Sequence, residues 1–139
     1  MRVVLDTNVL FSACWKPDGL EALVVGLALS GKITACVTAE IRTEYHDVLS
    51  RKKLAAVNVR AVEILAALDR TALTVETTER VNASTDEDDN RFLECAQAAG
   101  AAYLITGNLR HYPAIWGKTH ILNARTFLER TQPQSIPLQ

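Results

Sequence analysis

The sequence predicts a single α/β domain in which a parallel sheet is covered by helices on both faces. Short apolar or β-branched runs alternate with segments of helical spacing, the pattern of chains that build parallel sheets. The chain has 139 residues, which suits one domain with a sizeable core. Hydrophobic residues make up 48% and charged residues 22%, a composition that argues against disorder.

The first part of the chain holds two predicted strands and two predicted helices. Residues 3–5 form a β-branched apolar run that ends at a polar residue. The spacing of apolar residues predicts a helix over 20–29, which a Ser-Gly pair ends. Residues 33–37 form a second strand. Thr38 then caps a helix that continues to residue 49 and has a basic end, which suits the helix dipole.

The rest of the chain continues this alternation of helices and strands. The predicted elements are a helix at 59–69, a strand at 73–75, a helix around 92–99, strands at 103–105 and 121–122, and a helix at 125–130. The sheet therefore has about five strands. We expect one domain over residues 1–131 and a loose C-terminal tail over residues 132–139, which contain two prolines.

Charge and cysteine content narrow the class of protein. The net charge is −1 and the pI about 6.3, which excludes a polycation that coats nucleic acid but allows a basic rim around an acidic pocket. Cys14, Cys36 and Cys95 are odd in number and lack metal-ligand spacing, as expected for reduced thiols. The longest apolar stretch is too short to span a bilayer, and no signal peptide is evident. We therefore expect a cytoplasmic protein without a membrane segment.

Polar residues follow two of the predicted strands. Asp6 and Asn8 come after the first strand, and Thr106 and Asn108 come after the fourth. In open α/β sheets, ligands bind beyond the carboxyl ends of the strands at a topological switch point. These four residues are therefore candidates for a functional site.

Acidic residues add a candidate metal site. Glu40 and Glu44 share one face of the second predicted helix, and Asp86 to Asp89 precede the helix around residue 92. Carboxylates gathered in one pocket raise one another's pKa unless a cation lies between them. Hard oxygen ligands without His or Cys suit Mg²⁺ or Mn²⁺ rather than zinc. Metal sites of this kind commonly catalyse phosphodiester hydrolysis, provided that the residues converge in space.

Each of these features also has a purely structural interpretation. Asp6 can cap the segment after the first strand, and Glu44 can be a solvated helix residue. The acidic run can be a favourable helix start, in which Thr85 and Asp88 resemble a capping box. The three histidines are scattered singly, which favours surface positions or local hydrogen bonds.

Taken in order, four segments resemble the PIN-domain family, and specifically the bacterial PIN-type toxins of toxin–antitoxin pairs. The resemblance extends from Arg2 to about Leu128. Its carriers are Val4-Leu5-Asp6-Thr7-Asn8-Val9-Leu10, Glu40-Ile41-Arg42-Thr43-Glu44-Tyr45, Asp86-Glu87-Asp88-Asp89-Asn90-Arg91-Phe92-Leu93-Glu94 and Tyr103-Leu104-Ile105-Thr106-Gly107-Asn108.

This resemblance implies a three-layer α/β/α domain and a Mg²⁺- or Mn²⁺-dependent endoribonuclease that cleaves single-stranded RNA with metal-activated water. Asp6, Glu44 and Asp89 match the catalytic acids that hold the metal, and Asp86 lies one helical turn earlier as a further ligand. Asn108 stands where many PIN domains have a fourth carboxylate, so a second metal would be held more weakly. The resemblance also implies a homodimer and a cognate antitoxin.

Other residues are expected to contact the RNA. Thr106, Asn8, Arg91 and Arg110 are candidates to position the substrate, with Asn108 as a neutral ligand or water-orienting residue. Arg42, Lys52 and Lys53 are further candidates to bind the phosphate backbone.

Two alternative functions stay open at this point. The first is a catalytically weak or inactive PIN-fold interaction domain, which Asn108 favours. The second is another doubly wound phosphoryl-transfer domain. A haloacid-dehalogenase-type phosphatase needs a second Asp where Asn8 stands, and a response-regulator receiver needs paired acids and a lysine that are not evident.

Overall fold

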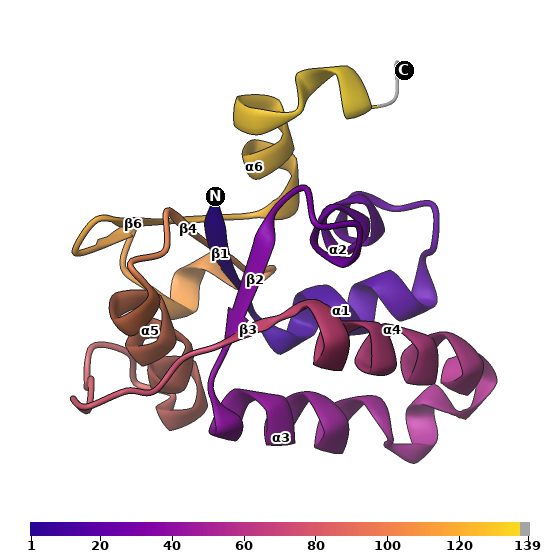
Figure 1. Ribbon diagram of the computed structural model, residues 1–139, viewed down its shortest axis with the longest axis horizontal. Coiled ribbons are helices and arrows are strands. Elements are labelled where there is room, and N and C mark those ends of the chain that lie inside the picture. The colour runs from indigo at the N-terminus through magenta and orange to yellow at the C-terminus, as the bar shows by residue number, and fades with distance from the viewer. Residues whose placement is uncertain (137–139) are drawn as a thin grey trace.

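A six-stranded, mostly parallel sheet runs through the computed structural model, which describes residues 1–136 (Figure 1). The strands are β1 (Arg2–Leu5), β2 (Thr34–Val37), β3 (Leu73–Thr74), β4 (Tyr103–Ile105), β5 (Ile115–Trp116) and β6 (Thr119–Leu122). Their order in the sheet is β3-β2-β1-β4-β6-β5. The predicted α/β class is confirmed. The expected five strands become six because β5 pairs with β6 in an antiparallel hairpin too short to leave a pattern in the sequence.

Helices cover both faces of the sheet, which completes the predicted three-layer arrangement (Figure 1). They are α1 (Thr7–Trp15), α2 (Leu20–Leu29), α3 (Ala39–Leu49), α4 (Asn58–Thr71), α5 (Glu87–Ala99) and α6 (Ala124–Thr131). Helix α5 packs against β1, β2 and β4, whereas α2 contacts α1, α4 and α6. Helix α3 contacts α1, α4 and α5, so it links the two helical layers.

The central strands are buried on both sides, as parallel strands between helical layers must be. Val3, Val4 and Leu5 of β1 have no exposed surface, and neither do Leu104 and Ile105 of β4. The pairing of Leu5 with Ile105 places the carboxyl ends of these two strands side by side.

Every predicted strand and helix occurs within a few residues of its expected position, but α1 was not predicted. Its buried residues Val9, Leu10, Ala13 and Cys14 follow helical spacing directly after the strand. The predicted caps are partly confirmed. The Thr38 hydroxyl accepts a hydrogen bond from the Ile41 amide, whereas Asp86 rather than Thr85 caps α5.

Three short 3-10 helices complete the described chain: η1 (Lys52–Val57), η2 (Leu109–His111) and η3 (Pro133–Ser135). Within the tail expected at 132–139, η3 forms one helical turn and Ile136 packs against the core, while residues 137–139 lie outside the described residues. The three cysteines are buried free thiols, as predicted, and burial raises the pKa of Cys95 to about 12. Among residues 1–136, no helix is both long and apolar enough to cross a membrane.

Candidate metal-binding active site

Strand register brings Asp6 and Thr106 together at the carboxyl edge of the sheet. The Asp6 amide donates to the Ile105 carbonyl oxygen at 2.9 Å, which continues the β1–β4 pairing by one residue. The Thr106 hydroxyl then donates to Asp6 Oδ2 at 2.8 Å. Asp6 occupies the N-cap position of α1, but within the described chain its side chain makes no capping hydrogen bond. Asp6 therefore has the cap position that the structural interpretation expected, and the hydroxyls of Thr106 and Tyr112 hold its carboxylate at the site.

Tyr112 joins Asp6 to the acid at the start of α5. Its hydroxyl lies 2.9 Å from Asp6 Oδ2 and 3.2 Å from Asp89 Oδ1. All three residues are buried. Two carboxylates that lie far apart in the sequence thus meet across one phenolic hydroxyl.

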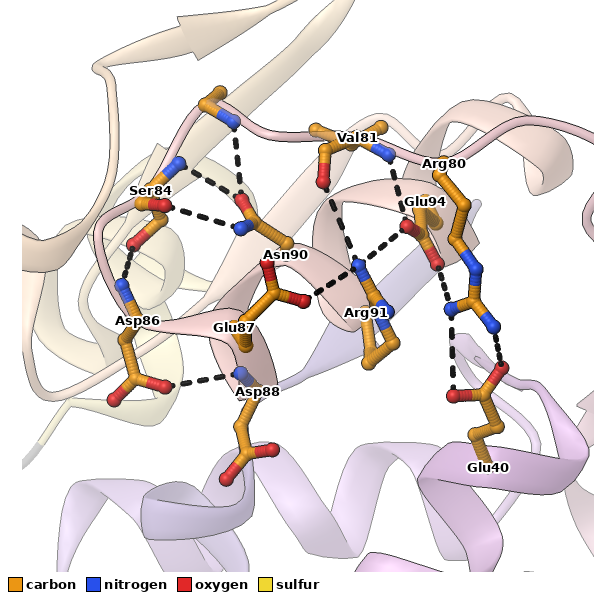
Figure 2. A network of polar contacts seen from close by, with 11 residues as sticks. Glu40, Arg80, Val81, Ser84, Asp86, Glu87, Asp88, Asn90, Arg91 and Glu94 are labelled. Carbon is orange, nitrogen blue, oxygen red and sulfur yellow. Dashed lines mark hydrogen bonds and ion pairs between the residues drawn. The ribbon is translucent and has the colours of Figure 1, made fainter.

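Helix α3 contributes Glu44 to the same place. The Glu44 carboxylate accepts a hydrogen bond from the Thr7 hydroxyl at the start of α1. Glu40, one helical turn earlier, forms an ion pair with Arg80 at 3.3 Å (Figure 2). The two glutamates therefore have different roles, and Glu44 is the one that lies beside Asp6.

These residues line a cleft of about 600 Å³ that carries a strong excess of negative charge. Of the described residues, seven acids and two arginines line it. The acids are Asp6, Glu40, Glu44, Asp47, Asp86, Asp88 and Asp89, and the arginines are Arg51 and Arg91. Burial raises the pKa of Asp6 above its ordinary value, and hydrogen bonds from Thr106 and Tyr112 oppose that rise. Burial, followed by the charges of neighbouring aspartates, also raises the pKa of Glu44 and of Asp89.

A histidine lies at the edge of the acidic cleft. One ligand atom each from Asp86, Asp89 and His111 lie within 4.8 Å of one another, and His111 Nδ1 is 3.0 Å from Asp89 Oδ2. The predicted local hydrogen bond of His111 is confirmed. His111 also lies close enough to both aspartates to be a candidate ligand, which its spacing in the sequence does not reveal, because it belongs to a different segment from Asp86 and Asp89.

The residues expected to position substrate fall into two groups. The Thr106 hydroxyl is almost fully buried and accepts from the Asn108 amide at 3.0 Å as well as donating to Asp6, so it orients Asp6. Asn8 Oδ1 accepts from the Gly107 amide at 2.9 Å, which ties α1 to the end of β4. Asn108 lines the cleft and is exposed, and so is Arg110 on η2 nearby.

Several of the expected RNA-binding cations already have acidic or aromatic partners. Arg91 forms ion pairs with Glu94 at 2.8 Å and Glu87 at 3.4 Å. Arg42 bonds to Asp69 and Thr74, and Lys53 lies over the ring of Phe11. Lys52 is exposed on η1, and the neighbouring Arg51, which was not singled out, lines the cleft.

The loop between β3 and α5 is held in place by two buried side chains of α5 (Figure 2). Asn90 Oδ1 accepts from the amides of Ala83 and Ser84, and its Nδ2 donates to the Ser84 carbonyl oxygen. Glu94 accepts from the Val81 amide at 2.9 Å. These contacts hold the segment of the chain that leads to Asp86 and Asp89.

Tyr112 was not among the predicted site residues. It follows Asn108 by only four residues, so the rule that places sites beyond strand ends could have found both Tyr112 and His111. The donor set as a whole fits a hard divalent ion, because at least three carboxylates converge in a cleft whose charge two arginines do not balance.

Comparisons with known proteins agree with this architecture. The PIN-domain family model matches residues 2–110. An uncharacterized protein of Methanocaldococcus jannaschii, MJ1680, is 33% identical over 112 residues, which cover 78% of this chain and 71% of that protein. The crystal structure of VapBC2 from Rickettsia felis, bound to a DNA fragment from its promoter, shares the fold with a TM-score of 0.61. This similarity covers 88% of this chain and 98% of that chain at 15% identity. Because the family match spans most of the chain and the fold agrees, the chain belongs to the PIN-domain family.

Proposed function

We propose that this protein is a Mg²⁺- or Mn²⁺-dependent endoribonuclease and the toxin component of a toxin–antitoxin pair. One observation carries the proposal: Asp6, Glu44 and Asp89 come from three separate elements and converge in a cleft that seven acids and two arginines line. A phosphodiester is itself an anion, so such a cleft would repel it without a bound cation. Membership of the PIN family supports the same conclusion, since PIN domains are generally nucleases.

Asp6, Glu44 and Asp89 would hold the ion, with Asp86 beside Asp89. A divalent ion bound there supplies charge neutralisation and lowers the pKa of water, which makes hydrolysis near neutral pH feasible. Tyr112 and Thr106 hold the Asp6 carboxylate in a fixed orientation, and Thr7 does the same for Glu44. Such preorganisation limits the reorganisation needed when substrate binds.

The exposed cations at the edge of the cleft are suited to the RNA backbone. Arg51 lines the cleft, and Arg110 lies beside Asn108 on η2. Phosphate contacts from such arginines hold a strand without reading its sequence. We propose single-stranded RNA as the substrate, with hydrolysis that leaves a 5′-phosphate and a 3′-hydroxyl.

The experiment that tests the nuclease is incubation of the purified chain with mixed single-stranded RNA. We expect cleavage with Mn²⁺, no cleavage with EDTA, recovery when Mn²⁺ is added back, and 5′-phosphate ends. Asp6→Asn should be inactive, whereas Asp18→Asn, at an exposed acid outside the cleft, should cleave like the wild type. Metal-independent cleavage that survives Asp6→Asn would refute the proposal.

The toxin assignment rests on the resemblance and on the fold shared with the Rickettsia felis VapBC2 structure. Induction of the chain alone in bacterial cytoplasm should slow growth, and Asp6→Ala should restore it. Coexpression with the neighbouring upstream gene should yield a complex with a small antitoxin, and light scattering should show a homodimer of the chain alone. Unimpeded growth at confirmed soluble expression would refute the toxin assignment.

A second candidate function is a PIN-fold interaction domain with weak or absent turnover. Asn108 favours it, because this exposed amide lines the cleft where many PIN domains have a carboxylate. Mn²⁺ binding without RNA cleavage would support this second candidate over the nuclease.

A further inference from the structure

We infer that Asp86, Asp89 and His111 form a second cation position, which rests on the proposed metal-dependent function and favours a first-row transition-metal ion such as Mn²⁺ over Mg²⁺. The geometry of the three side chains is the first support. His111 Nδ1 and Asp89 Oδ2 are 3.0 Å apart. Two neighbouring ligands of an octahedral ion with bonds of about 2.1 Å are also separated by about 3.0 Å.

Asp89 connects this second position to the first. Its Oδ1 lies 3.2 Å from the Tyr112 hydroxyl, which also contacts Asp6. Its Oδ2 is the oxygen next to His111. One carboxylate therefore has a separate oxygen beside each group of side chains, so Asp89 would contribute to both positions.

The buried Ser84 side chain holds the backbones of Asp86 and His111 in place. The Ser84 hydroxyl donates to the His111 carbonyl oxygen at 2.7 Å and accepts from the Asp86 amide at 3.2 Å. Asn90 in turn binds the Ser84 backbone on both sides (Figure 2). The backbones of Asp86 and His111 are thus fixed to one hydroxyl, although they belong to different segments of the chain.

The chemistry of the donor set decides which ion fits. Mg²⁺ takes oxygen ligands. Mn²⁺ also suits carboxylates, but it belongs to the first-row series that binds mixed nitrogen and oxygen sites, in which it is the weakest binder and the later ions bind imidazole more tightly. Asn108 offers only a neutral amide at the cleft, so a second ion there depends on the charges of Asp86 and Asp89 and on the nitrogen of His111. This arrangement replaces a missing carboxylate with a nitrogen donor from the next helical turn of the chain.

Pulsed electron paramagnetic resonance of Mn²⁺ bound to the full chain tests this inference, because a directly bound imidazole gives a nitrogen hyperfine coupling. We expect the coupling in the wild type and in His120→Gln, a control at an exposed histidine on β6, and its loss in His111→Gln. Calorimetric titration should show Mn²⁺ affinity at this position falling at least about 10-fold in His111→Gln, with Mg²⁺ affinity changing less than about 3-fold.

The possible outcomes separate this inference from the proposed function. Mn²⁺ that binds the wild type without nitrogen coupling would mean that the His111–Asp89 contact is a hydrogen bond only; the inference then fails and the oxygen-ligand site stands. Coupling that persists in His111→Gln would also overturn it. Failure of the wild type to bind Mn²⁺ at all would overturn both proposals. Because the His111 side chain is half exposed, His111→Gln should fold, and the wild-type spectrum is decisive without it.

Discussion

Replacing Asp6 by Asn removes one negative charge from the acidic cleft while it leaves both side-chain hydrogen bonds of that residue in place. The hydroxyls of Thr106 and Tyr112 both contact the same oxygen, Asp6 Oδ2. An Asn side chain that places its amide oxygen there keeps both contacts. The substitution therefore tests the effect of charge separately from the effect of packing.

The distances from the Tyr112 hydroxyl to the two carboxylates limit how far apart Asp6 and Asp89 are, and so give the size of their repulsion. Its hydroxyl lies 2.9 Å from Asp6 and 3.2 Å from Asp89, so these carboxylate oxygens are separated by no more than the two distances together. Two unit charges about 6 Å apart repel by about 3 kcal/mol at an effective dielectric constant of about 20. Without metal, we expect Asp6→Asn to raise the free energy of unfolding by about 1–3 kcal/mol, or several degrees in Tm.

The pH dependence follows from the direction of the pKa shift. The pKa of Asp6 in the folded chain is raised above its ordinary value of 3.8, mainly by burial. Ionisation of Asp6 therefore opposes folding, and the wild type is destabilised most at pH values above the raised pKa. As the pH falls through that pKa towards 3.8, the wild type regains stability. The difference in free energy of unfolding between the wild type and Asp6→Asn then becomes smaller.

Thermal unfolding followed by circular dichroism in EDTA, at neutral pH and near pH 4, measures both effects. A titration with Mn²⁺ should then stabilise the wild type more than Asp6→Asn, which keeps Asp86, Asp89 and His111 but lacks the Asp6 carboxylate. Asp18→Asn controls for the loss of one exposed carboxylate elsewhere and should unfold like the wild type under all conditions. An Asp6→Asn variant less stable than the wild type in EDTA at neutral pH would refute the repulsion argument. Equal stabilisation of both proteins by Mn²⁺ would refute the role of Asp6 as a ligand.

Three further substitutions test the surroundings of the site. Asn108→Asp adds a carboxylate to the cleft, so it should lower stability in EDTA and increase the stabilisation by Mn²⁺. Calorimetric titration should show that a second Mn²⁺ ion binds more tightly than in the wild type. An unchanged affinity for the second ion would contradict this prediction. Tyr112→Phe removes a buried hydroxyl that lowers the pKa of both Asp6 and Asp89, so it should reduce stability in EDTA at neutral pH by about 1–2 kcal/mol, with little change near pH 3. A loss of equal size at both pH values would instead indicate a packing defect. Glu94→Gln removes the charge of a buried carboxylate that pairs with Arg91, so urea unfolding should show a loss of about 3 kcal/mol. Proteolysis should also cut the loop near Arg80 faster, and unchanged protection of this loop would show that Asn90 suffices to hold it.

Much of the fold could be predicted from local patterns. Helix 20–29 and strand 103–105 have the predicted bounds, because each is a short apolar segment with clear polar or glycine ends. The omissions have physical causes. Strand β5 has two residues and exists only because β6 pairs with it, and α1 begins directly at the end of β1, without a turn that would separate the two elements.

The candidate site could be predicted in part. Asp6 and Thr106 follow adjacent parallel strands, so the sheet rule alone expects them to meet, as they do. The pairing of Arg91 with Glu94 and Glu87 was not expected, although these residues lie three and four positions apart on one helix. A charged residue near a predicted site can therefore stabilise the supporting loop rather than bind the substrate.

The sequence by itself determined the class of the fold and the supply of acidic residues, because both depend on local composition and periodicity. Only the tertiary structure decided which acids share a cleft, that Tyr112 links Asp6 to Asp89, and that His111 joins Asp86. The physical reason is that these contacts depend on strand register and on the path of the chain after β4. Register is set by hydrogen bonds and packing between segments about a hundred residues apart, which no local spacing encodes.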